Sequence, residues 1–69
     1  MNKQEALRAM KDGKKICHEY YSDKEYLYIN PDNGNIHTED GVDCGTEQNV
    51  FWTNIQKWEA GWSIYNPKN

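Results

Sequence analysis

The chain has 69 residues, of which 36% are hydrophobic and 13% aromatic, and its formal net charge is −3. A chain this short forms one domain, residues 1–69, with a modest core that buries about 60% of the surface exposed when unfolded. Two cysteines are too few for a disulfide scaffold, so we expect self-association to supply further stability. The sequence has neither an apolar run of about 18 residues nor a recognisable signal peptide, which predicts a cytoplasmic protein with reduced thiols and no membrane partner.

Charge is distributed unevenly along the chain. Residues 1–15 contain five bases and two acids, whereas residues 16–56 contain eight acids and one base. Two interpretations stay open: these are ordinary solvated faces, or they pair subunits head to tail or meet a basic partner. Without a basic groove, polymeric nucleic acid is a poor candidate partner.

An N-terminal helix is indicated by Asn2 and Glu5, which have the spacing of a capping box and predict a start at Lys3. Gly13 stands where the left-handed residue after a helix is expected. An apolar stripe is formed by Ala6, Leu7, Ala9 and Met10. Because isolated helices of about ten residues are marginal, this one is expected to pack on a sheet.

Four further segments read as strands. The first is Lys14 to Tyr21, which alternates Ile16, His18 and Tyr20 with Cys17, Glu19 and Tyr21, and Ser22 to Lys24 form a polar turn. A meander follows over residues 25–45, in which Tyr26, Tyr28 and Asn30 alternate with Leu27 and Ile29. A type I′ turn after Pro31 is predicted by Asn33 and Gly34, and the second strand of the meander continues through Ile36 and Thr38. A second turn over Glu39 to Gly41 then leads into a third strand, Val42 to Cys44.

The segment after Gly45 is harder to interpret. Thr46 to Trp52 fits a helix or a strand, and we favour irregular structure with one helical turn. Thr53 and Gln56 form a second possible capping box, and Gly61 could close a turn over residues 54–60. A closing strand is predicted over Trp62 to Tyr65, ended by Pro67.

These elements predict an α+β fold, with a short N-terminal helix packed on a small antiparallel sheet made of a β-meander and a closing C-terminal strand. Metal and catalytic sites are not expected. Adjacent Cys17 and His18 on a strand point to opposite faces, so they and His37 and Cys44 lack the close pairing of a zinc site. A Cys17–Cys44 disulfide is geometrically possible, but a cytoplasmic chain keeps it reduced. No frame of the acidic residues 32–43 fits an EF-hand, nothing marks an oxyanion hole, and no cofactor is implied.

Aromatic residues are the remaining signal, because nine of them exceed what a thin helix-on-sheet layer covers completely. Either some form the core and the rest pack on the surface, or they line a cleft or interface. We expect a homo-oligomer whose contact includes some of Tyr21, Trp52, Trp58 and Trp62, with Arg8 and Glu19 orienting a polar ligand between subunits.

The residues Glu5-Ala6-Leu7, Met10-Lys11 and Gly13-Lys14-Lys15-Ile16, and later Gly61-Trp62-Ser63-Ile64-Tyr65, resemble the opening and the end of a family of very small phage and prophage proteins. That family includes Thoeris anti-defence proteins, which sequester a cyclic ADP-ribose-type immune signal between subunits of a homo-oligomer. Where those proteins carry a basic pair and a tryptophan, this chain has Cys17, His18 and Tyr21.

The resemblance implies a phage-encoded, non-catalytic counter-defence protein in the host cytoplasm. Such a protein binds either a small nucleotide signal or a host defence protein. The alternative is a small structural or regulatory interaction module without a ligand, and a third class is a hydrolase acting on such nucleotides.

Overall fold

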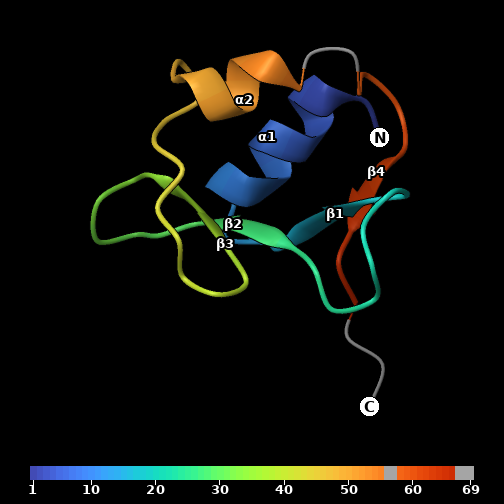
Figure 1. The fold of residues 1–69 in the computed structure, drawn as a ribbon, viewed down its shortest axis with the longest axis horizontal. Coiled ribbons are helices and arrows are strands. Elements are labelled where there is room, and N and C mark those ends of the chain that lie inside the picture. Colours follow the sequence, from blue (N-terminus) through green and yellow to red (C-terminus); the bar gives the residue numbers. More distant parts are fainter. Residues whose placement is uncertain (56–57, 67–69) are drawn as a thin grey trace.

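The structure is a computed structural model that describes residues 1–55 and 58–66. Its elements in chain order are α1 (Lys3–Lys11), β1 (Ile16–His18), β2 (Leu27–Ile29), β3 (Ile36–Thr38), α2 (Val50–Asn54) and β4 (Trp62–Ile64) (Figure 1). The predicted α+β arrangement is confirmed, since the N-terminal helix packs against a four-stranded antiparallel sheet.

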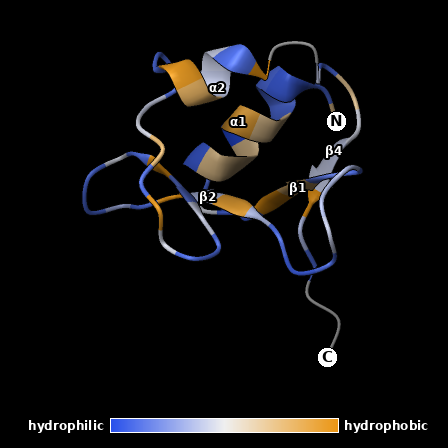
Figure 2. Cartoon of the chain, viewed as in Figure 1, coloured by the Kyte–Doolittle hydropathy of each residue, from blue (hydrophilic) through white to orange (hydrophobic). Residues whose placement is uncertain are grey.

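The start of α1 agrees with the capping-box prediction. The Asn2 side chain accepts a 2.8 Å hydrogen bond from the Glu5 amide, and the Glu5 carboxylate accepts a 2.9 Å bond from the Asn2 amide. Gly13 follows the helix with φ of +90°. Figure 2 shows hydrophobic residues on α1, α2, β1 and β2. The buried core consists of Ala6, Ala9, Met10, Ile16, Leu27, Ile36, Trp52 and Trp62.

The sheet has the strand order β3-β2-β1-β4, so the closing strand β4 pairs with β1 and not with the meander. β1 faces β4 over three residue pairs but joins β2 only through Ile16 and Leu27. The predicted first strand was too long. The Tyr21 amide donates a 2.8 Å bond to the His18 carbonyl, which turns the chain out of the sheet after His18.

The meander differs from its prediction at both ends of β3. Asn33 does not have a positive φ, so the turn is not of type I′. Pro31, whose ring fixes a negative φ, starts a four-residue loop that the Gly34 amide closes with a 2.7 Å bond to the Asn30 carbonyl. The predicted third strand is reduced to a single bridge between His37 and Asp43.

The segment before β4 contains a five-residue helix, slightly more than the one helical turn that we expected. Its N-cap is Asn49, and not Thr53 as the second capping box predicted, because the Thr53 hydroxyl lies inside α2 and donates back to the Asn49 carbonyl at 3.1 Å. Gln56 and Pro67, which also figured in these predictions, lie outside the described residues.

α2 packs on the rest of the fold through its side chains, with Trp52 in the core and Phe51 against it. The Trp52 ring is buried at 5.5 Å from the Trp62 ring, and the buried Lys3 ammonium bonds to the Trp52 carbonyl at 2.6 Å. Burial lowers the pKa of Lys3, an effect that Glu59 partly opposes.

Candidate functional site

His18 lies at the centre of the aromatic cluster at the end of β1. Its ring stacks on Trp58 at 4.7 Å between centroids and meets the Trp62 ring edge-on at 4.8 Å. Nδ1 accepts a 3.2 Å bond from the Tyr20 amide, and Nε2 donates a 2.8 Å bond to the Ala60 carbonyl. Since an amide can only donate and a carbonyl only accept, these bonds fix one neutral tautomer and occupy both ring nitrogens.

The four aromatic residues predicted to bind a ligand or partner divide into two pairs. Trp52 and Trp62 are 5% and 2% exposed, so they form the core and offer almost no surface to another molecule. Tyr21 and Trp58 are half-buried, and their rings meet edge-on at 5.9 Å. A contact between subunits that uses this cluster therefore has Tyr21 and Trp58 available and not the other two.

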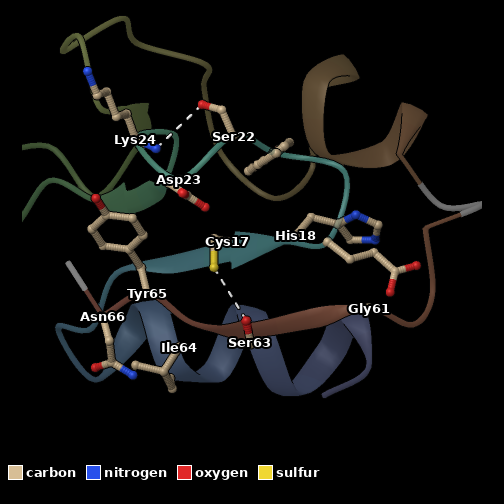
Figure 3. Close-up of a pocket in the computed structure, with 12 residues that line it drawn as sticks. Cys17, His18, Ser22, Asp23, Lys24, Gly61, Ser63, Ile64, Tyr65 and Asn66 are labelled. Atoms are coloured by element: carbon tan, nitrogen blue, oxygen red, sulfur yellow. Dashed lines mark hydrogen bonds between the residues drawn. The ribbon is translucent and has the colours of Figure 1, made fainter. Parts of the chain in front are cut away.

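A groove of about 600 Å³, named here the outer groove, runs along the β1–β4 pair (Figure 3). Cys17 and Ser63 lie in its middle, between the turn that follows β1 and the end of β4. Its lining residues are Cys17, His18, Glu19, Tyr21, Ser22, Asp23, Lys24, Gly61, Ser63, Ile64, Tyr65 and Asn66.

The outer groove presents both polar and apolar groups. The Cys17 thiol lies 3.3 Å from the Ser63 hydroxyl, and Lys24 is the only lysine or arginine among the described lining residues, beside the acids Glu19 and Asp23. Cys17 is half-buried between buried Ile16 and His18, so the alternation along β1 places its thiol and the His18 ring on opposite faces. The two do not form a nucleophile–base pair.

A row of rings continues from this groove across the sheet. The Tyr65 and Tyr26 rings are 4.7 Å apart, Tyr26 and Tyr28 are 6.1 Å apart, and Tyr28 and His37 are 5.7 Å apart. The Lys15 ammonium lies 4.8 Å from the centre of the Tyr26 ring. Tyr65 is thus held against a second ring while it also lines the groove.

The two predicted charged residues are not brought together. Glu19 lines the outer groove, whereas Arg8 is exposed on α1 and lines a separate hollow with Asn2, Gln4 and Glu5. Within one chain they cannot orient the same ligand.

Ser63 and Tyr65 line the outer groove although the sequence did not predict them as site residues. Ser63 follows buried Trp62 in the closing strand, and that alternation is the signal that could have placed it on the face away from the core. Asp23 and Lys24 were read only as turn residues, and their part in the groove depends on how the turn folds back.

Metal-binding residues do not gather in the described part of the chain, where no three His, Cys, Asp or Glu side chains are placed to share an ion. Cys17 and Cys44 are both free. Burial, with a smaller effect from Asp43, raises the pKa of the Cys44 thiol, so that thiol is less reactive than an exposed one.

No protein-family model, curated protein or solved structure matches the chain. Over residues 1–55 and 58–66, no helix has the length and apolar character needed to cross a membrane. The likeness to phage anti-defence proteins thus stays a prediction.

Proposed function

We propose that this protein is a non-catalytic binding protein that holds a small ring-bearing ligand of the nucleotide class in the outer groove. One observation carries the proposal: the groove has the volume of a small-molecule site and is bounded by Tyr65, Tyr21 and several hydrogen-bonding groups. By resemblance, the biological role is phage counter-defence, in which the ligand is an immune signal of the host and is withdrawn by binding.

The groove offers complementary groups to each part of such a ligand. Tyr65, supported by Tyr26 at 4.7 Å, presents a ring on which a base can stack. Ser22, Ser63 and Asn66 offer hydrogen bonds to a sugar, and Lys24 at the edge of the groove brings one positive charge that favours a phosphate. Because two carboxylates accompany one ammonium, this set favours a ligand with few negative charges over a highly phosphorylated one.

The same geometry supports binding without catalysis. A nucleophile needs a base within hydrogen-bond reach, but the Cys17 thiol is next to a serine hydroxyl and His18 uses both ring nitrogens on the backbone. Binding without turnover is the chemistry that these groups support.

Calorimetry with a panel of cyclic and linear nucleotides tests the proposal. We expect heat for at least one mononucleotide-sized ligand, and Tyr65→Ala should weaken that binding about tenfold by removing the stacking ring. Tyr28→Ala is the matched control, because Tyr28 is a half-buried ring of the same row that does not line the groove. No heat across the panel would favour the alternative function, an interaction module without a ligand. Loss of the ligand detected by chromatography would instead identify a hydrolase.

The expected homo-oligomer is a separate part of the proposal. Light scattering at several concentrations and two salt levels measures it directly. A monomer under every condition would rule out a site between subunits, while the outer groove, which lies within one chain, would still be open to test.

A further inference from the structure

A second groove, named here the α2 groove, lies between α2 and the β2–β3 pair and has a volume of about 420 Å³. Its apolar lining comes from Tyr21, Leu27, Val42, Phe51, Ile55 and Trp58. Phe51 of α2 and Ile55 just after it form one wall of the groove, and Leu27 of β2 lies on the other side. The apolar lining is open to solvent at Val42, which is 58% exposed.

The rim of the α2 groove is acidic. Glu25, Glu39 and Asp40 border it, and none of the described lining residues is a base. The Ser22 amide donates to the Glu25 carboxylate at 2.9 Å, and the Tyr26 amide donates to the Glu39 carboxylate at 3.2 Å. The ion pairs found among the described residues involve neither of these carboxylates nor Asp40, so no described base neutralises the rim.

Tyr21 lines the α2 groove, and the pKa of its phenol depends on the surrounding burial and charges. Burial, followed by the charges of Glu25, Cys44 and Glu39, raises the pKa of its phenol from 10.0 to about 12. The neighbouring carboxylates therefore make this wall unfavourable for a further negative charge and favourable for a positive one.

We propose that the α2 groove is a docking site for a basic amphipathic segment of another protein, whose apolar side chains fill the groove and whose lysines or arginines meet the acidic rim. The occupant is identified by charge complementarity and by the exposed apolar lining, above all Val42, which is 58% exposed at the mouth. This site does not require the ligand proposed for the outer groove.

A model peptide serves as the probe: a peptide of about 14 leucines and lysines arranged with one apolar helical face. Calorimetry should detect its binding to the full chain. Two control peptides separate the contributions, one with glutamate in place of lysine and one with the same leucines and lysines in an order that gives no apolar face. We expect each control to bind at least about tenfold more weakly.

Matched variants locate the binding. Val42→Lys puts a cation at the mouth of the groove and should weaken the peptide about tenfold, whereas Val50→Lys makes the same change at a 70% exposed residue of α2 that does not line the groove and should change affinity less than about twofold. Glu39→Gln keeps an acceptor for the Tyr26 amide but removes one rim charge, so it should weaken binding of the peptide about threefold. Its control is Asp32→Asn in the exposed β2–β3 loop, which should leave the affinity unchanged. Thermal unfolding of each variant verifies that it is folded.

Three outcomes would overturn the inference. The first is no binding of the leucine–lysine peptide, or equal binding of the glutamate peptide. The second is equal affinity of folded Val42→Lys and Val50→Lys for the probe. The third is a self-associated wild type that Val42→Lys converts to a monomer, because the occupant would then be a second copy of this chain. Failure of the nucleotide panel would not affect these results.

Discussion

The Lys3 ammonium lies 5.1 Å from the centre of the Trp52 ring and donates a 2.6 Å hydrogen bond to the Trp52 carbonyl. This pair joins the first turn of α1 to α2. It also explains how a lysine is buried at this position, because its charge lies near the Trp52 ring and one of its donors bonds to the Trp52 carbonyl.

Replacing Lys3 with methionine should lower the free energy of unfolding by about 1–3 kcal/mol, since the Trp52 carbonyl loses a charged donor. Urea unfolding followed by tryptophan fluorescence measures the change. Lys14→Met is the control, as Lys14 is exposed, and it should stay within about 0.5 kcal/mol of the wild type. A Lys3→Met protein as stable as the wild type would show that the bond contributes nothing.

Gly61→Ala should destabilise the fold more than Gly13→Ala does. Both glycines have a left-handed φ, +93° and +90°, so each alanine carries a backbone cost of about 1 kcal/mol. At Gly61 the new Cβ would also lie 2.9 Å from His18 Nε2, whereas at Gly13 nothing lies within 4 Å. We expect an extra loss of about 1–2 kcal/mol in urea unfolding and shifted NMR signals of the His18 ring. Equal losses for the two variants would contradict the crowding at His18.

Stability should decrease in alkali partly because of Tyr21. Its pKa is raised from 10.0 to about 12 in the folded chain, so the unfolded chain loses the proton first. The resulting stabilisation is complete below pH 10 and is lost as pH rises through the folded pKa of about 12. After allowance for the partial exposure of the side chain, we expect a contribution of about 1–2 kcal/mol.

Tyr21→Phe should remove this part of the pH dependence between pH 10 and about 12. Tyr20→Phe, at a residue that is 70% exposed, should leave it in place. The comparison requires urea unfolding of the three proteins across that pH range. Parallel curves for all three would exclude Tyr21 as the titrating group.

The Asp43 carboxylate should titrate at higher pH when Asn35 is changed to alanine. Asn35 Nδ2 donates to the two carboxylate oxygens at 3.1 and 3.0 Å, and this bond, followed by the Gly45 amide, holds the pKa of Asp43 below its ordinary value of 3.8. A lowered carboxyl pKa favours the fold above pH 3.8, and the effect is lost as pH falls through the folded pKa. NMR titration of the carboxyl carbon measures the shift, with exposed Asn54→Ala as the control.

Local signals predicted local structure well. The capping box at Asn2 and Glu5 gave the start of α1, and the period of two separated Leu27, which is buried, from Tyr26 and Tyr28. The first strand was drawn too long because the alternation of side chains continues to Tyr21 although the backbone turns at His18. Periodicity describes which side chains share a face, and it does not show where the backbone turns. The turn after His18 is favoured by the packing of Tyr21 on Trp58.

The grooves could not be predicted from the sequence for a different reason. Both depend on distances between elements: the α2 groove on the position of α2, and the outer groove on the path of the turn that carries Asp23 and Lys24. Aromatic content alone also could not separate buried Trp62 from half-buried Trp58, which differ by four positions and lie in one cluster. Only the pairing of β4 with β1 distinguishes them.

Tyr21 lines both grooves, so a single side chain forms part of two walls. Two molecules that contact one ring do not bind independently when either shifts that ring. The effect of the first on the affinity for the second must then equal the reverse effect, by thermodynamic linkage. A ligand in the outer groove that shifts the Tyr21 ring would therefore change the affinity of the α2 groove for its partner.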